Sequence, residues 1–301
     1  MMNRLQDLGE DALISKLVGG LAVREDLIVG PGDDCAVIDV GDNERYQLLK
    51  TDCIVEGVHY LPEAAPEDVG WKAVARVISD FAAMGGYPSQ LLVTIILPGT
   101  QQVDYVEKMY QGMQRCAGAF GAIISGGETS SIPDEAAAVI SVSGTGWVAK
   151  EKLVKRGGGK AGDVVMVTGE LGGSIRGKHL TFTPRVKEAA WLVENFPLNA
   201  MMDLSDGLAK DLPRLAKLSG CGYEVEEGSL PCSDGVDVSE AVGDGEDYEL
   251  LFTVSAEDKD KILQEWQQIF PMLKLSAIGS LTSHDYPVSQ LKNGWEHFTS
   301  T

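Results

Sequence analysis

The sequence predicts an α/β or α+β protein with two domains. Strand-like and helix-like segments alternate along its 301 residues, which is typical of folds that combine sheets with helices. A polar, glycine-rich segment, Lys150–Asp163, interrupts this alternation. The length suits two domains of ordinary size or one large one. We therefore expect an N-terminal domain over residues 1–150 and a C-terminal domain over residues 151–301.

The first half contains two helices whose ends can be predicted. Pro66 is typical of a first helical turn, and the glycines at 85 and 86 end a helix, so one helix is expected over Pro66–Met84. Apolar residues recur on one stripe of a second helix, Val103–Phe120. The expected strands of this half are Tyr46–Asp52, Leu91–Leu97, Ala122–Ser125 and Ala136–Val148.

The second half repeats this mixture of strands and helices. Pro213 lies inside one predicted helix and is expected either to kink it or to restart it after Asp211. The expected strands are Val164–Thr168, Ala200–Asp203, Glu249–Val254 and Leu275–Ile278, and the expected helices are Arg185–Glu194, Ser205–Ser219 and Ala256–Phe270.

The composition restricts the possible partners. A net charge of −20 disfavours nucleic acid, because phosphate groups bind lysine and arginine. The same charge disfavours ATP unless divalent cations lie between the two sets of negative charges. No apolar run approaches the roughly 20 residues that span a bilayer, and the acidic N-terminal segment does not resemble a signal peptide. We expect a cytoplasmic protein that does not enter the membrane.

One acidic residue falls on the apolar stripe of a predicted helix. Asp80 lies three residues after Val77 and four before Met84. A buried carboxylate needs a cation or hydrogen bonds, because burying an isolated charge is costly. Two alternatives are therefore open: an ion pair with Arg76, one turn earlier, or a metal ion.

Further acids lie where predicted strands or loops end. Each could alone cap a helix or form a turn, but together they provide the hard oxygen ligands that Mg²⁺ prefers. A shared divalent cation would also explain why two aspartates are adjacent in the glycine-rich stretch GPGDDCAVID. These acids are Asp33, Asp34, Asp52, Glu128, Asp203 and Asp206.

A near match to a phosphate-binding loop is not expected to act as one. Gly172–His179 follows a predicted strand and almost spells G-x-x-x-x-G-K-[ST], but His179 replaces the hydroxyl residue that binds Mg²⁺. Arg176 also crowds the backbone amides of the loop. The sequence contains neither G-x-S-x-G nor H-E-x-x-H.

Six segments resemble, in order and spacing, the thiamine-monophosphate kinases, a branch of the aminoimidazole-ribonucleotide synthetase superfamily with the PurM-like fold. The resemblance covers almost the whole chain, and GEDYELLFTV and DLSDGL are its most specific motifs. The six segments are GPGDDCAVI, KTDCIVEGVHY, VISDFAAMGGYP, SGGETS, MDLSDGLAKDL and GEDYELLFTV.

The resemblance implies a site for each ligand. The implied Mg²⁺ ligands are Asp34, Thr51, Asp52, Asp80, Glu128, Asp203 and Asp206. The implied ATP contacts are Tyr110, Gly127, Glu128, Arg156 and Ser205. The implied contacts to thiamine monophosphate are His59, Glu246 and Trp295. Tyr110 fits a plain core position on its helical stripe equally well.

The resemblance also implies the reaction: several Mg²⁺ ions assist transfer of the γ-phosphoryl group of ATP to thiamine monophosphate. The acceptor is a phosphate monoester with a second pKa of about 6, so it is already anionic and needs charge neutralisation and alignment rather than a base. The implied assembly is a homodimer formed through the N-terminal sheet, with a C-terminal α/β domain beside it.

Two residues depart from the family pattern. Glu128 replaces the usual aspartate, and Lys50 replaces a small hydroxyl residue, so the number of bound ions is left open. Two alternative functions are also left open. One is another ATP-dependent reaction of the superfamily, as in aminoimidazole-ribonucleotide synthetase, selenophosphate synthetase or the hydrogenase-maturation dehydratase. The other is a protein that binds Mg²⁺ and nucleotide without catalysis.

Overall fold

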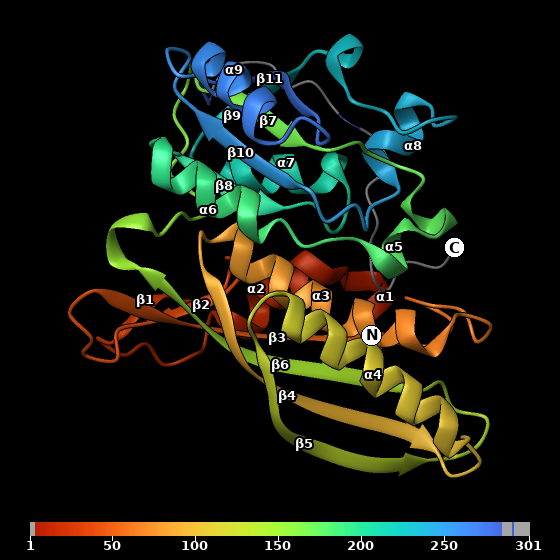
Figure 1. The fold of residues 1–301 in the computed structure, drawn as a ribbon. Helices are drawn as coiled ribbons and strands as arrows, with labels where there is room; N and C mark the ends of the chain where they lie inside the picture. Colours follow the sequence, from red (N-terminus) through yellow and green to blue (C-terminus); the bar gives the residue numbers. More distant parts are fainter. Residues whose placement is uncertain (1–3, 285–290, 292–301) are drawn as a thin grey trace.

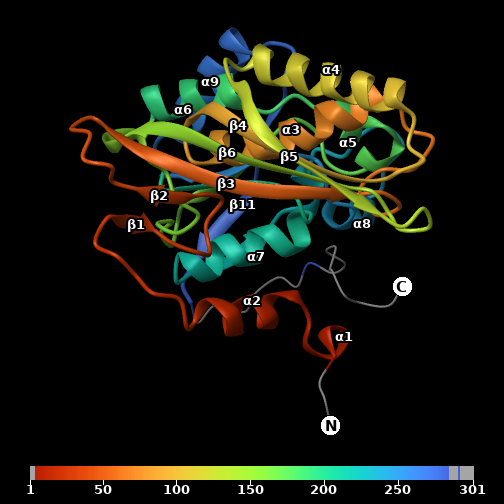
Figure 2. The same ribbon diagram turned by 90° about the horizontal axis from the view of Figure 1, so that it is seen from below.

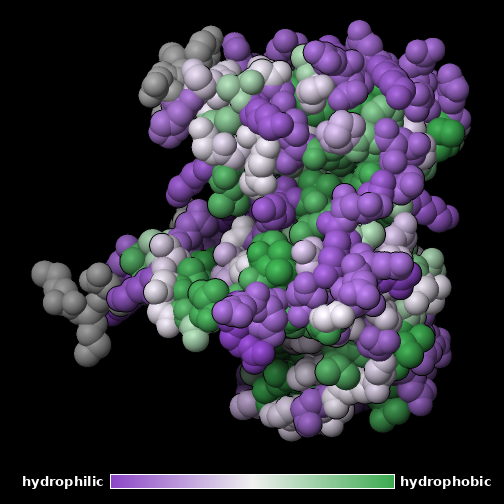
Figure 3. Space-filling view, turned by 90° about the vertical axis from the view of Figure 1, so that its left-hand side faces the viewer, coloured by the Kyte–Doolittle hydropathy of each residue, from purple (hydrophilic) through white to green (hydrophobic). Residues whose placement is uncertain are grey.

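The computed structural model describes residues 4–284 and residue 291, and it contains two sheets that lie one above the other in Figure 1. The predicted substrate contact Trp295 lies outside the described residues. Hydrophilic side chains cover much of the face in Figure 3, and hydrophobic side chains gather where the two halves meet. Among the described residues, no helix is both long enough and apolar enough to cross a membrane.

The first sheet has six strands in the order β1-β2-β3-β6-β4-β5. All neighbours are antiparallel except β4 and β5, which are parallel. Helices α3 and α4 pack on one face of this sheet (Figure 1). The strands are β1 (Leu27–Val29), β2 (Ala36–Ile38), β3 (Arg45–Val55), β4 (Tyr87–Pro98), β5 (Ile123–Ile132) and β6 (Val139–Ala149).

The second sheet has five strands in the order β8-β10-β7-β11-β9, and every neighbouring pair is antiparallel. The protein is therefore α+β, the second of the two classes that the sequence allows. The segment Lys150–Asp163 links the two sheets. The strands are β7 (Val164–Thr168), β8 (Ala200–Asp203), β9 (Gly222–Val225), β10 (Leu250–Val254) and β11 (Leu275–Thr282).

Helices cover both faces of the second sheet. Alternate strand residues separate two cores: Met166 and Met201 join the core that includes α3, whereas Val165 and Val167 pack with α7 on the opposite face. The α-helices are α1 (Leu5–Leu8), α2 (Glu10–Val18), α3 (Pro66–Ala83), α4 (Val103–Ala119), α5 (Lys178–Thr181), α6 (Val186–Asn195), α7 (Leu208–Leu218), α8 (Val238–Gly243) and α9 (Lys259–Ile269).

Helix α3 lies between the two sheets. It contacts β3 and β6 on one side and α5, α6 and β8 on the other. Consequently 13 of its 18 residues are buried, although its sequence predicts only a single apolar stripe. One core runs from Phe81 through Leu192 to Trp266 and joins the two halves.

The N-terminal helix α2 lies beside α7, as Figure 2 shows. Two ion pairs join them: Lys210 Nζ lies 3.0 Å from Glu10 Oε2, and Arg214 Nη2 lies 2.9 Å from Asp11 Oδ1. No residue of α2 is buried. The helix is therefore held largely by charge.

Most of the predicted elements are present, with differences at their ends. Helix α7 continues through Pro213, so of the two alternatives the restart after Asp211 is wrong. Strand β5 extends to Ile132, well beyond the predicted Ser125, because its glycine- and serine-rich continuation pairs with β4. The short strands β1, β2 and β9 and the helices α1, α2, α5 and α8 were not predicted.

Two glycines allow α3 and α4 to approach closely. A Cβ atom on Gly70 would lie 1.9 Å from the Met109 carbonyl oxygen, and one on Gly112 would lie 1.9 Å from that of Glu67. These contacts are to rigid backbone, so any side chain would force the helices apart.

We therefore expect Gly70→Ala to lower the free energy of unfolding by about 1–3 kcal/mol, as overpacking does elsewhere. The matched control is Gly118→Ala on α4, where a Cβ atom meets nothing within 4 Å. That change should be neutral or stabilise by up to about 1 kcal/mol. Urea unfolding followed by circular dichroism measures both. Equal effects of the two changes would contradict the close approach.

Candidate active site

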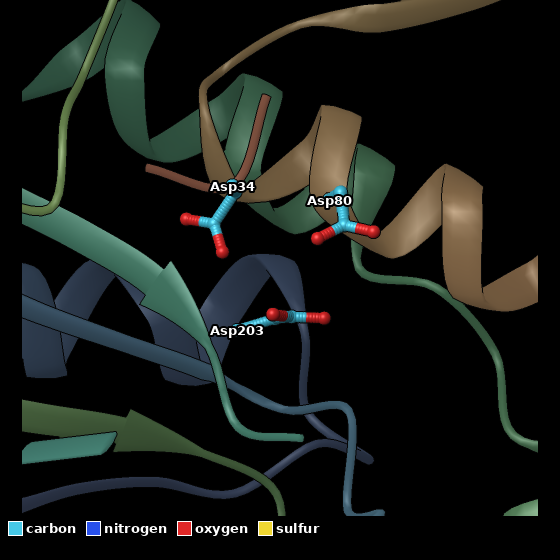
Figure 4. Close-up of side chains that lie close together, drawn as sticks. All are labelled: Asp34, Asp80 and Asp203. Atoms are coloured by element: carbon cyan, nitrogen blue, oxygen red, sulfur yellow. The ribbon is translucent and has the colours of Figure 1, made fainter. Parts of the chain in front are cut away.

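Three buried aspartates from different elements meet between the two sheets. Asp34 precedes β2, Asp80 lies on α3, and Asp203 ends β8. Each offers a carboxylate oxygen, and these atoms all lie within 4.8 Å of one another. Figure 4 shows the three side chains converging on one space. We call Asp34, Asp80 and Asp203 the carboxylate cluster.

The protein supplies only part of the charge that this cluster requires. Lys50 Nζ lies 2.7 Å from Asp80 Oδ1, and Arg156 Nε lies 3.1 Å from Asp34 Oδ1. Asp203 accepts a hydrogen bond of 2.6 Å from the Ser79 hydroxyl. Asp34 Oδ2 is buried and has no hydrogen-bond partner among the described residues.

The pKa values of the carboxylate cluster reflect this shortage of positive charge. Burial, followed by the neighbouring Asp34, raises the pKa of Asp203 to about 6. Burial also raises the pKa of Asp80 well above its usual range, although Lys50 opposes this effect. A hard divalent cation would satisfy Asp34 Oδ2 and stabilise the ionised carboxylates. The donor set therefore fits Mg²⁺.

The adjacent aspartates Asp33 and Asp34 are joined through Arg156. Both oxygens of Asp33 lie 3.2 Å from the backbone nitrogen of Arg156, and Asp33 Oδ1 also accepts from the Asp34 N–H. The Arg156 guanidinium bonds to Asp34. Asp33 thus turns toward the backbone, and only Asp34 of the pair enters the carboxylate cluster.

Asp52 is paired with Arg76 from α3. Arg76 Nε lies 3.1 Å from Asp52 Oδ2, at an angle that does not make a hydrogen bond, and Arg76 Nη1 donates to the Cys53 carbonyl. The alternative of an Arg76–Asp80 pair is therefore wrong, because the cation 2.7 Å from Asp80 is Lys50.

Two other predicted metal ligands lie on the far side of the first sheet. Side chains alternate along β3, and the Thr51 hydroxyl lies 2.9 Å from Ser143 Oγ on the face without helices. Glu128 is exposed on the edge strand β5, which β4 and β6 separate from β3. The single chain does not bring these two side chains to the carboxylate cluster.

The predicted nucleotide contacts near Glu128 also lie apart from the cluster. Gly127 packs so tightly on β4 that a Cβ atom would lie 1.8 Å from the Val93 carbonyl oxygen. Tyr110 is half-buried on α4 and packs against the core, which fits the alternative that it is a core residue.

A polar cavity of about 500 Å³ opens onto the cluster. Asp206 lines it and is held by Arg214, whose Nη1 lies 2.6 Å from Asp206 Oδ2, and by Lys210 at 3.4 Å. Further lining residues are Glu10, Asp33, Lys50, Asp52, Arg76, Asp80, Arg156, Asp203, Ser205 and Lys217.

A second cavity of about 300 Å³ adjoins the first, and the two share the lining residues Arg76, Ser205, Asp206 and Tyr248. His59 and Glu246 line this second cavity together with the apolar Val58 and Ile175. Two chemically different spaces therefore meet at Arg76.

A fully buried lysine joins the two predicted substrate contacts. Lys72 Nζ lies 2.7 Å from Glu246 Oε2 and also donates to the His59 carbonyl. Burial lowers the pKa of Lys72 to about 8, although Glu246 opposes this shift. Lys72 follows Val69 by three residues on the stripe that revealed Asp80, so the same argument could have found it. Its link holds α3 against the loop that carries Glu246.

Side-chain contacts hold the loop from Gly245 to Glu249 in one conformation. Glu246 and Tyr248 have positive φ angles of 56° and 51°, which side-chain-bearing residues seldom adopt. Tyr248 stacks on Phe182 with 3.9 Å between ring centroids. Arg185 binds Glu249 with two contacts of 2.7 Å. These contacts fix the position of Glu246.

Asp247 explains why Gly172–His179 is not a phosphate loop. The Gly172 N–H lies 3.0 Å from Asp247 Oδ1, and the Gly173 N–H lies 2.8 Å from Asp244 Oδ2. The backbone donors that would hold a phosphate are thus bound to the protein's own carboxylates.

We expect the His59 ring to titrate near pH 4, because burial and the nearby Arg76 lower its pKa to about 4. The unfolded chain, with an ordinary histidine pKa of about 6.5, binds this proton first. The contribution of His59 to stability therefore falls as the pH drops through this window. Histidine NMR of the folded and urea-unfolded protein measures both values. Titration of folded His59 near pH 6.5 would contradict its burial beside Arg76.

Comparison with known proteins assigns the chain to a family. Residues 32–148 match the model for the AIR synthase related protein, N-terminal domain, and residues 138–291 match the corresponding C-terminal domain. The thiamine-monophosphate kinase of Rhodopirellula baltica is 36% identical over 83% of each chain. That of Aquifex aeolicus is 32% identical over 98% of this chain and all of its own.

Solved structures agree with this assignment. The complex of AaThiL with AMPPCP and TMP superposes with a TM-score of 0.82 at 30% identity and covers 99% of each chain. Escherichia coli HypE, at 20% identity and a TM-score of 0.69, shares the fold. The predicted resemblance is confirmed: the chain has the PurM-like fold and belongs to the thiamine-monophosphate kinase family.

Proposed function

We propose that the protein transfers the γ-phosphoryl group of ATP to thiamine monophosphate and produces thiamine diphosphate and ADP. The observation that carries this proposal is the adjoining pair of cavities that share Arg76, Ser205, Asp206 and Tyr248. A triphosphate held at the carboxylate cluster would therefore be beside an acceptor held at His59 and Glu246.

The larger cavity suits the triphosphate of ATP. Asp34, Asp80 and Asp203 would hold Mg²⁺, which when bound neutralises phosphate charge. Arg156 and Arg76 add fixed positive charge at the same cavity, and Ser205 offers a hydroxyl there. Of the other predicted nucleotide contacts, Tyr110, Gly127 and Glu128 lie on α4 and β5. These three residues would contact ATP only if the nucleotide extends from the larger cavity to α4 and β5.

The smaller cavity suits thiamine monophosphate. His59 Nδ1 accepts the Val55 N–H at 3.1 Å, so the neutral ring carries its proton on Nε2. The carboxylate of Glu246, fixed by Lys72, offers a negative charge to the positively charged thiazolium ring. The acceptor phosphate attacks without a base, because its second pKa is about 6. The protein's contribution is therefore charge neutralisation and alignment.

We expect Asp203→Asn to lower kcat at least a hundredfold, an increase of about 3 kcal/mol in the barrier, because the cluster then binds its cation less tightly. Asp39→Asn is the matched control, since Asp39 pairs with Lys150 outside the two cavities, and it should leave turnover within twofold. Thiamine diphosphate formation from ATP, Mg²⁺ and thiamine monophosphate is measured by fluorescence chromatography.

The wild-type assay separates this function from its alternatives. ADP release with another acceptor but without thiamine diphosphate would indicate a different reaction of the superfamily. Binding of ATP and Mg²⁺ without turnover would indicate a non-catalytic nucleotide-binding protein. Normal turnover in Asp203→Asn would remove Asp203 from the site.

We also propose that residues 1–150 and 151–301 form the two domains. We further propose that two copies of the chain pair through the face of the first sheet that none of the described helices covers. That face has a shallow cavity of about 510 Å³ between Leu49, Leu92 and neighbouring residues, and Leu92 is 53% exposed. An exposed apolar sheet face is typical of a protein interface. It also carries Thr51, so the predicted ligands on this side would face the partner copy. The cytoplasm remains the expected compartment.

We expect Leu92→Glu to halve the molar mass in solution, because a charge placed in an apolar interface is left without a partner. Val103→Glu is the control, since Val103 is 72% exposed at the start of α4, on the helix-covered side of the sheet. Light scattering after gel filtration measures the mass. A wild-type monomer, or a dimeric Leu92→Glu variant, would exclude this interface.

A further inference from the structure

Lys50 enters the carboxylate cluster from β3. Its ammonium group lies 2.7 Å from Asp80 Oδ1, and the lysine side chain is only 22% exposed. The ammonium group of a lysine is positively charged at neutral pH. The cluster thus contains a permanent cation, supplied by the chain itself.

The three carboxylates of the cluster are satisfied unequally. Lys50 is bound to Asp80, and Arg156 is bound to one oxygen of Asp34. Among the described residues, no salt bridge involves Asp203, which accepts only from the Ser79 hydroxyl. In the same part of the chain, the buried Asp34 Oδ2 accepts no hydrogen bond. Within the described residues, the carboxylate oxygens that lack a positively charged partner are therefore those of Asp203 and Asp34 Oδ2, and an added cation would bind between these two residues.

We propose that Lys50 is a resident cation that occupies the place at Asp80 Oδ1 where a divalent ion would otherwise bind. The wild-type cluster then takes up one divalent cation fewer than a variant with a small hydroxyl residue at position 50. This inference rests on the proposed function only in that the cluster binds divalent cations. An ion bound to an aspartate oxygen at about 2.1 Å would be repelled by an ammonium group on that same oxygen.

Manganese binding provides the test, because Mn²⁺ has the same preference for oxygen ligands as Mg²⁺ and can be counted by electron paramagnetic resonance. Three variants of the full chain are compared with wild type: Lys50→Thr, Lys50→Arg and Lys50→Met. Lys50→Thr removes the charge and leaves space, Lys50→Arg keeps the charge, and Lys50→Met removes the charge but fills the space.

We expect Lys50→Thr to bind one Mn²⁺ per chain more than wild type at saturation. Lys50→Arg should bind the wild-type number, and Lys50→Met should bind no extra ion. In EDTA the Tm of Lys50→Thr should fall by several degrees, because Asp80 loses its partner, and millimolar Mg²⁺ should restore it. The Tm of Lys50→Met should fall similarly without this recovery.

An equal Mn²⁺ count in wild type and Lys50→Thr would overturn the proposal, and so would an equal gain in Lys50→Arg. If Lys50→Thr does not fold in EDTA, it is purified in Mg²⁺ and exchanged into Mn²⁺ for the same count. Turnover of wild type with thiamine monophosphate is measured separately. Failure of that assay leaves the ion count interpretable, so the two proposals can fail independently.

Discussion

Buried negative charge is the constraint on which the rest of this structure depends. Three carboxylates meet within 4.8 Å of one another, and ions removed from water are costly unless they are paired. The chain responds with a cation or hydroxyl from a separate element for each: Lys50 from β3, Arg156 from the segment between the sheets, and Ser79 from α3. The carboxylate cluster can therefore form only when β3, α3 and the segment between the sheets are all in place.

Helix α3 brings the two halves of the site together. Its polar residues Lys72, Arg76 and Asp80 recur every four residues and so form one row along the helix. Lys72 bonds to Glu246, which lines the smaller cavity, Arg76 borders both cavities, and Asp80 belongs to the carboxylate cluster. The apolar residues around this row pack against both sheets and keep it at a fixed position between them.

The sequence was sufficient where a residue broke a local pattern. Asp80 could be found because a carboxylate on an apolar stripe requires a partner, and Lys72 obeys the same rule. The choice between the α/β and α+β classes depends on whether neighbouring strands are parallel or antiparallel. The periodicity of apolar residues in the sequence does not contain that information. The separation of Glu128 from Asp52 depends on the strand order, with β6 and β4 between β3 and β5. The positive φ angles of Glu246 and Tyr248 are also hidden, because neither residue is a glycine.

The continuous core around α3 limits how ligands can enter and leave. Swinging the two sheets apart would break the contacts that α3 makes with the second half: Trp71 with the Phe182 carbonyl, Ser79 with Asp203 and Lys72 with Glu246. Nucleotide and product therefore have to pass through the mouths of the cavities while the sheets stay docked. The larger cavity is bordered by Glu10 and Ile14 of the surface helix α2. Ligands can therefore enter and leave it when α2, which is held by ion pairs, moves aside.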